Sequence, residues 1–167
     1  MSRLAPRSSV LPGSVLPGHG LLGQVLLCLG LLAAPACRTD QAPRSVLTVH
    51  APKPIGPYSQ AVARGDFLFL SGQIGLDPES GVLVSGGIAP ETERALENLR
   101  AVLAAEGLDF RHVVSVNAYL VDLGEFAAFN DVYGKALGGE APARATVQVA
   151  ALPKGARVEL QCIALRP

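Results

Sequence analysis

The sequence predicts an α+β domain built from one antiparallel-rich sheet with two helices on one of its faces. Stretches with strand-like alternation precede, separate and follow two stretches with helical spacing, so the expected element order is β-β-β-α-β-α-β-β. Glycine and proline residues mark the boundaries between these stretches. The chain of 167 residues is long enough for one domain with a sizeable core.

Three strands are expected in the first half of the domain. Residues 45–49 (SVLTV) alternate and are rich in β-branched side chains, which favours a strand. The APKPIGP segment that follows contains three prolines in seven residues, so regular structure is excluded there. Residues 59–72 (SQAVARGDFLFLSG) are typical of two strands that turn at Gly65 and Asp66. The LDPESG that comes next is expected to be a turn around Pro78.

Two helices and a strand between them are expected next. The hydrophobic period becomes helical from Pro90 to Glu106, and Gly107 is placed to end this helix. Its apolar stripe consists of Leu96, Leu99, Val102 and Leu103. After a strand at 113–121, a shorter helix is expected at 124–137. The apolar stripe of this second helix consists of Phe126, Phe129, Tyr133 and Leu137.

Two final strands, 143–150 and 156–166, are separated by LPKG. If LPKG is a tight turn, the two strands form a hairpin, and the alternation of side chains brings five polar residues to one face. These residues are Arg144, Thr146, Gln148, Glu159 and Gln161. One pocket would then hold a cation at one end, a carboxylate at the other and a hydroxyl between them. The alternative is that Arg144 and Glu159 are solvated charges at strand ends, and spacing alone favours this alternative.

The last strand suggests that the second face of the sheet is also covered. Val158, Leu160, Cys162 and Ala164 point to one face, and Arg157, Glu159, Gln161 and Ile163 point to the other. Both faces therefore carry apolar residues mixed with polar ones. Two helices can cover only one face, so the other would be partly apolar and open, which favours an oligomer.

Composition excludes several classes of function. The 14 basic and 14 acidic residues balance, and the segment from Cys37 onward has a net charge of −2 because Arg3 and Arg7 precede it. A nucleic-acid partner is therefore not expected, and the absence of Trp removes one common platform for stacking bases. Cys28, Cys37 and Cys162 have neither metal-ligand spacing nor the density of a disulfide scaffold. No metal site is expected.

Residues 1–36 are expected to be an export signal. Arg3 and Arg7 precede an apolar run of 16 residues, LLGQVLLCLGLLAAPA, which is short for a stable span of the bilayer and ends on small residues. AAPAC also resembles a degenerate lipobox, with Cys37 as the lipidated residue.

This assignment predicts three parts of the chain. A signal at 1–36, possible lipid on Cys37, a linker at 37–44 and a domain at 45–167 would give a periplasmic or membrane-anchored protein. The alternative is a mis-assigned start, because the doubled SVLPG before the apolar run is unusual for a signal, and the protein would then be cytoplasmic.

Five segments carry a family resemblance that covers residues 45–166. They are IGPYSQA, SGQIGLDPESG, LVSGGI, VNAYLVDLGEFAAFNDVYG and PARATVQVAALPKGARVEL. In this order they resemble segments of the RidA (YjgF) family of imine and enamine deaminases. The resemblance implies a chorismate-mutase-like fold and a homotrimer with pockets in the clefts between subunits. Such a trimer would cover the second face of the sheet.

The resemblance also implies the reaction and the residues of the site. The reaction is hydrolysis of a 2-imino acid, or its enamine tautomer, to a 2-oxo acid and ammonia, with no metal or organic cofactor. Arg144 would bind the substrate carboxylate as a bidentate clamp, and Glu159 would orient or deprotonate water, directly or through Thr146. Backbone groups near Gly72 would stabilise developing charge, and Tyr58 would close the pocket from the neighbouring subunit. The substrate-binding residues implied are Tyr58, Ser71, Gly72, Asn130, Tyr133 and Thr146.

Two other functions are compatible with the same residues. A trimeric binding module for 2-oxo acids or other small carboxylates would need Arg144 but not Glu159. A ribonuclease or inhibitor of translation is disfavoured, because the chain is neutral and has no basic stripe. His50 and His112 have no nucleophile near them in the sequence, and Cys162 is expected to be a core thiol.

Overall fold

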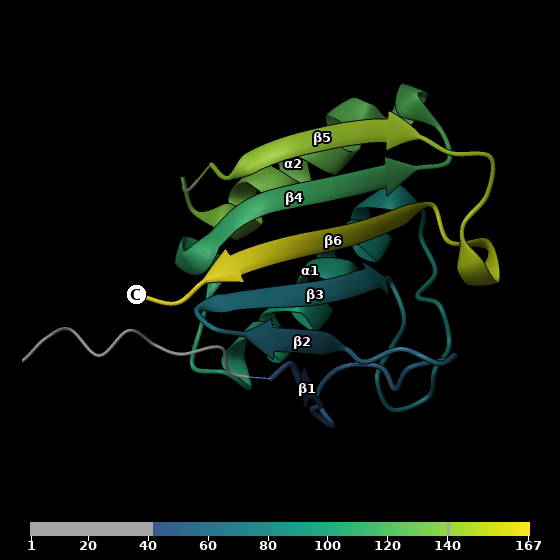
Figure 1. Ribbon diagram of the computed structural model, residues 1–167. Coiled ribbons are helices and arrows are strands. Elements are labelled where there is room, and N and C mark those ends of the chain that lie inside the picture. Colours follow the sequence, from purple (N-terminus) through teal and green to yellow (C-terminus); the bar gives the residue numbers. More distant parts are fainter. Residues whose placement is uncertain (1–41, 140) are drawn as a thin grey trace, which may run out of the picture. The chain divides into compact units, whose positions relative to one another are not determined.

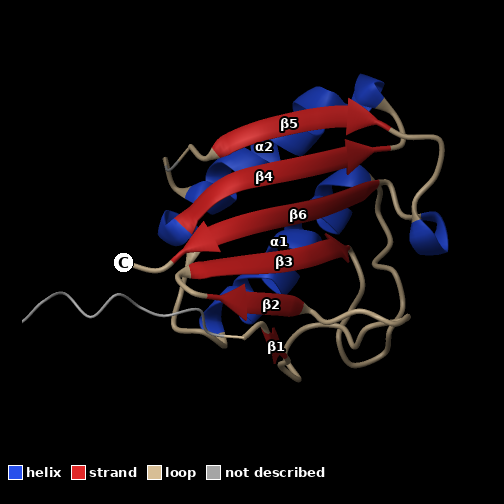
Figure 2. Cartoon of the chain, viewed as in Figure 1, coloured by secondary structure: helices blue, strands red, loops and turns tan. Residues whose placement is uncertain are grey.

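A six-stranded sheet with two helices on one face makes up the part of the chain that the computed structural model describes, residues 42–139 and 141–167 (Figure 1, Figure 2). The strands are β1 (Arg44–Val46), β2 (Ala61–Arg64), β3 (Phe67–Ile74), β4 (Val113–Leu120), β5 (Ala143–Gln148) and β6 (Val158–Leu165). The helices are α1 (Ile88–Ala104) and α2 (Phe126–Leu137), with short 3₁₀ turns at Phe110–His112, Leu123–Glu125 and Pro153–Gly155. This confirms the predicted α+β class and element order. The expected signal, Cys37 and most of the linker lie outside the described residues.

The order of strands across the sheet is β1-β2-β3-β6-β4-β5, with β4 and β5 parallel and every other neighbouring pair antiparallel. The predicted hairpin of the last two strands is therefore wrong, because β4 lies between β5 and β6 (Figure 1). The turn itself is present, since the Gly155 amide donates to the Leu152 carbonyl at 3.2 Å. The connection, however, passes around the end of β4, where the Val149 amide donates to the Leu120 carbonyl at 2.8 Å.

The register also corrects the predicted arrangement of polar residues. Arg144 pairs with Val116, which pairs with Cys162, so Arg144 points to the face that the helices cover. Glu159 pairs with Tyr119, one position along β6 and β4 from a pair that faces the helices. Successive residues of a strand point to opposite faces, so Glu159 points to the face opposite Arg144. The prediction assumed that β5 and β6 are neighbours when it assigned side chains to faces. Since β4 lies between them, Arg144 and Glu159 do not share a face.

The core lies between the sheet and the two helices (Figure 2). The predicted stripe of α1 is confirmed, because Leu96, Leu99, Val102 and Leu103 are all buried. In α2 the residues Phe129, Tyr133 and Leu137 are buried as well. Phe126 was expected in the same stripe, but it is the first residue of α2 and is 38% exposed.

The second face of the sheet remains open in the described chain, as expected. The large apolar side chains of the strands that are substantially exposed include Phe67, Phe69, Val147 and Leu165. Phe67 and Phe69 lie side by side on β3 with stacked rings 5.9 Å apart. On β6 the prediction that alternate residues face the core is confirmed, since Val158, Leu160, Cys162 and Ala164 are buried. The described residues contain no helix that is both long and apolar enough to cross a membrane.

Candidate functional site

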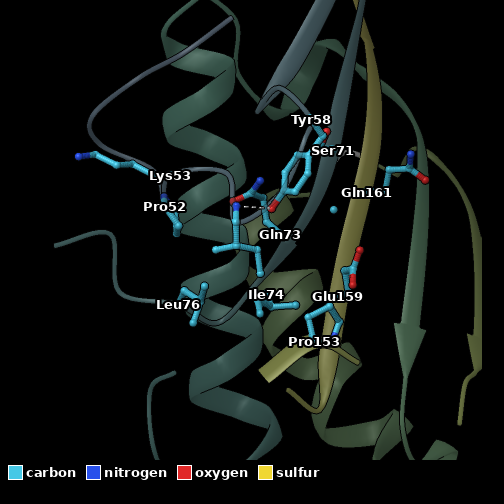
Figure 3. Close-up of a pocket in the computed structure, with 12 residues that line it drawn as sticks. Pro52, Lys53, Tyr58, Ser71, Gln73, Ile74, Leu76, Pro153, Glu159 and Gln161 are labelled. Atoms are coloured by element: carbon cyan, nitrogen blue, oxygen red, sulfur yellow. Dashed lines mark hydrogen bonds between the residues drawn. The ribbon is translucent and has the colours of Figure 1, made fainter. Parts of the chain in front are cut away.

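A bulge in β3 creates the cavity that contains Glu159. Leu70 pairs with Cys162 and Gln73 pairs with Leu160, so two residues of β3 stand opposite a single residue of β6. The cavity has a volume of about 330 Å³ and opens beside this irregularity. Its walls come from the 52–58 loop, the bulge and the residues after it, Pro153, and the side chains of Glu159 and Gln161 (Figure 3).

Glu159 lies against the backbone at Gly72. A Cβ added to Gly72 would overlap Oε1 of Glu159 and lie 2.7 Å from its Cδ, so the glycine makes room for the carboxylate. Burial raises the pKa of Glu159 above its ordinary value. Among the described residues, no hydrogen bond or ion pair engages this carboxylate. A half-buried and unengaged carboxylate of this kind can accept a proton from water.

Three further polar groups surround the cavity. The Ser71 hydroxyl donates to the Ser59 carbonyl at 2.6 Å, which fixes the edge of the bulge. The Tyr58 hydroxyl accepts from an amide of its own loop at 3.2 Å, and the ring stands over the cavity (Figure 3). Tyr58 therefore lines the same cavity as Glu159 within one chain, and the expectation that it closes a pocket shared with a neighbouring subunit stays a prediction. Gln161, which was not predicted as a site residue, also lines the wall.

Two buried amides hold the loops that form the cavity. The Gln60 amide nitrogen donates to the Pro52 carbonyl at 2.9 Å, which anchors the loop before Tyr58. Asn98 of α1 donates to the carbonyls of Ile74 and Leu76 at 3.1 and 2.9 Å. Because both amides are buried, these bonds are shielded from competing water.

Arg144 belongs to a second cluster on the helix-covered face. Its Nη2 donates to Asn130 Oδ1 at 2.8 Å. Its guanidinium carbon lies 4.5 Å from the ring centre of Tyr133, 5.4 Å from that of Phe129 and 5.8 Å from that of Phe126. Arg144, Asn130 and Tyr133 line a cavity of about 490 Å³. Phe126 and Phe129 were expected to be core residues, and their contact with Arg144 was not predicted. The sequence signal for this contact is the helical spacing that puts them on one face of α2 with Asn130 and Tyr133.

Thr146 does not connect the two clusters. It pairs with Ala118, which pairs with the buried Leu160, so it points to the helix-covered face and away from Glu159. Its hydroxyl is buried without a hydrogen-bond partner in the described chain. The prediction that Thr146 lies between Arg144 and Glu159 is therefore wrong.

The predicted site residues thus form two groups in one chain. Tyr58, Ser71 and Gly72 lie with Glu159, while Asn130 and Tyr133 lie with Arg144. Within the described ranges, no group of three or more His, Cys, Asp or Glu side chains is placed to hold a metal ion. Cys162 is buried as expected, and burial raises the pKa of its thiol to about 12.

Comparison with known sequences gives extensive matches. The family model described as Endoribonuclease L-PSP matches residues 48–166. Protein DfrA of Myxococcus xanthus is 54% identical over 126 residues, which cover 74% of this chain and 96% of that protein. The 2-iminobutanoate/2-iminopropanoate deaminase of Homo sapiens is 47% identical over 123 residues, which cover 74% of this chain and 90% of the human protein.

Solved structures show the same fold at clear sequence identity. RidA from an Antarctic Psychrobacter species is 43% identical, with a TM-score of 0.71 and coverage of 73% of this chain and 98% of that one. TdcF of E. coli with bound serine is 35% identical, with a TM-score of 0.71 and coverage of 74% and 99%. The residues that the family model matches, 48–166, include both clusters.

Proposed function

Because the chain belongs to the Endoribonuclease L-PSP (RidA/YjgF) family, we propose that it hydrolyses reactive 2-imino acids or their enamine tautomers to 2-oxo acids and ammonia. The observation that carries this proposal is the carboxylate of Glu159, half-buried in a cavity and free of any partner in the described chain. A relative that is 47% identical is named for this reaction. The product of the reaction would retain the carboxylate of the substrate.

The site is proposed to be completed by a second copy of the chain. Arg144 is on β5, the edge strand of the sheet, and in one chain it points to the face opposite Glu159. The exposed apolar residues Phe67 and Phe69 on the open face would be covered in the homotrimer that the family resemblance implies. Arg144 of one copy would then reach the Glu159 cavity of the next.

In this arrangement each residue has a separate task. Arg144 binds the substrate carboxylate with two parallel N–H groups, which holds the imine carbon near Glu159. Glu159 accepts a proton from water while the water oxygen bonds to the imine carbon, and it passes this proton to the imine nitrogen to give an amino alcohol. Glu159 then takes the hydroxyl proton of the amino alcohol and returns it to the nitrogen as the carbon–nitrogen bond breaks, which releases the 2-oxo acid and ammonia. Backbone groups at the bulge beside Gly72 would stabilise the charge that develops.

An ammonia-release assay tests this proposal. The substrate is a 2-imino acid generated immediately before use, and the protein is segment 37–167, which contains every described helix and strand. We expect ammonia release well above the spontaneous rate. Equal rates with and without the protein, at a concentration where it binds pyruvate, would defeat the deaminase proposal.

A second candidate is a binding module for small carboxylates. It is favoured by the relative TdcF, whose structure contains bound serine. Glu159→Gln distinguishes the two functions, because Arg144 alone suffices for binding. Under the binding function, the wild-type protein would bind pyruvate and show no hydrolysis that Glu159→Gln removes.

A further inference from the structure

One face of α2 encloses the guanidinium of Arg144. Phe126, Phe129, Asn130 and Tyr133 occupy helical positions i, i+3, i+4 and i+7, and all four contact Arg144 across the edge of the sheet. We propose that these four residues, the α2 clamp, are positioning residues that fix the orientation of Arg144 for a ligand carboxylate. The inference rests on the proposed function, because it assigns a role within that same site.

The hydrogen bond to Asn130 leaves Arg144 able to bind a carboxylate. Asn130 Oδ1 accepts from Nη2 at 2.8 Å, and the guanidinium also lies beside the Tyr133 phenol, whose pKa it lowers against the effect of burial. A guanidinium carries more donors than this bond uses, so a pair of parallel N–H groups stays available. Arg144 lines the cavity of about 490 Å³, where a ligand carboxylate could reach it.

The aromatic rings restrict the remaining motion. The Tyr133 ring centre is 4.5 Å from the guanidinium carbon and the Phe129 ring centre is 5.4 Å from it, within the range of cation–π attraction. Both rings are buried in the core, so they form walls that do not move with the arginine. A side chain held before the ligand arrives loses less conformational freedom on binding, which strengthens binding.

The clamp is electrically neutral, and this preserves the charge of Arg144. An amide and three rings hold the guanidinium, and among the described residues it forms no ion pair with a carboxylate. Burial raises the pKa of Tyr133, so the phenol is uncharged at neutral pH. An aspartate at position 130 could accept the same hydrogen bond but would compensate the positive charge. The amide of Asn130 orients the cation without this competition.

This role differs from the direct substrate contact that the family resemblance implied for Asn130 and Tyr133. The acceptor oxygen of Asn130 is already used by Arg144. The Tyr133 hydroxyl is buried without a hydrogen-bond partner in the described chain, and the Tyr133 ring centre lies 4.5 Å from the guanidinium carbon. Both residues would therefore act on the ligand through Arg144.

A double-mutant cycle between Asn130 and Arg144 tests the proposal on kcat/KM for imine hydrolysis by segment 37–167. Asn130→Ala should lower kcat/KM about tenfold, mainly by raising KM, with the melting temperature little changed. In an Arg144→Ala background the same substitution should cost less than about twofold, because the residue it positions is absent. Asp131→Ala, an exposed change in the same helix, is the control and should leave kcat/KM unchanged. A full tenfold loss in both backgrounds would overturn the proposal.

Two further variants separate positioning from loss of structure. Asn130→Asp keeps the size and the acceptor but adds a charge, and we expect it to raise KM at least as much as Asn130→Ala. Tyr133→Phe should raise KM less than Tyr133→Leu does, because the ring remains in Tyr133→Phe. If Tyr133→Phe is as impaired as Tyr133→Leu, the hydroxyl rather than the ring is required and the clamp is wrong.

The same cycle measured on pyruvate binding separates this inference from the proposed function. If the wild-type protein releases no ammonia but the variants of the cycle lose pyruvate affinity non-additively, the clamp is supported and the proposed hydrolysis is defeated. If the wild-type protein releases ammonia but the variants lose pyruvate affinity additively, the clamp is overturned and the proposed hydrolysis is unaffected. Pyruvate affinity unaffected by both Asn130→Ala and Tyr133→Leu would also overturn the clamp.

Discussion

At Gly72 the absence of a side chain makes room for the carboxylate of Glu159. Gly72→Ala would place a methyl group where Oε1 now lies, so the carboxylate must move. We expect hydrolysis to fall at least about tenfold, because loss of a well-placed proton acceptor costs that much or more. Pyruvate binding and assembly should persist. Gly134→Ala, where an added methyl group meets no atom within 4 Å, is the stability control.

The pH dependence of hydrolysis should report the environment of Glu159. Burial raises its pKa above 4.5, and only the ionised form can accept a proton from water. The rate of hydrolysis should therefore rise with pH through the pKa of Glu159, which burial raises and which Arg144 of a neighbouring copy would lower again. Glu159→Gln should remove this acidic limb of kcat/KM together with most of the hydrolysis and leave pyruvate binding. An acidic limb that persists in this variant would assign it to another group.

At the scale of elements, patterns within a single segment predicted the structure better than the expected pairing of strands did. The stripes of α1 and the alternation of β6 are properties of a single segment, and both were confirmed. The hairpin of β5 and β6 was wrong because the position of β4 between them depends on contacts between residues far apart in sequence. Arg144 and Glu159 could be named as site residues from the resemblance to a family. That they lie on opposite faces of the sheet follows from the order of the strands, which cannot be read from the spacing of residues in the sequence.

The junction of α1 and β6 gives a prediction about stability. Glu91 of α1 is 4% exposed and accepts from the Arg157 amide at 2.7 Å. Burial raises its pKa, so its ionised form is less favourable in the folded state than in the unfolded state. The free energy of unfolding therefore falls as pH rises from the ordinary carboxyl pKa through the raised one, and the penalty is present at pH 7.

Glu91→Gln should consequently be more stable than wild type at pH 7, because it removes the buried charge and keeps an acceptor. The difference should disappear below about pH 4, where the wild-type carboxyl is protonated in both states. Glu91→Ala should be less stable by about 1–3 kcal/mol, since the Arg157 amide loses its partner. Urea unfolding at both pH values measures these differences, and a less stable Glu91→Gln at pH 7 would contradict the assignment.

At the scale of the whole molecule, we propose that residues 1–36 direct export and that Cys37 carries the membrane attachment. Two or more acyl chains give stable attachment where one is marginal. Intact-mass analysis of the native protein should show a chain that begins at Cys37 and is heavier by its lipid, and Cys37→Ala should release it into the soluble fraction. An unmodified chain beginning at Cys37 would indicate simple secretion, and a full-length cytosolic chain would defeat the export proposal.

The division of the site between two faces makes assembly part of catalysis. If Arg144 of one copy acts with Glu159 of the next, Arg144→Ala and Glu159→Gln trimers should each retain only residual activity but should complement each other. Co-expression with two different affinity tags, followed by purification on both, isolates trimers that contain both variants. Each mixed trimer then holds one complete site, so activity should be about a third of the wild-type value. The doubly tagged wild-type trimer is the control, and mixed trimers no more active than the single variants would show that the two residues do not meet across subunits.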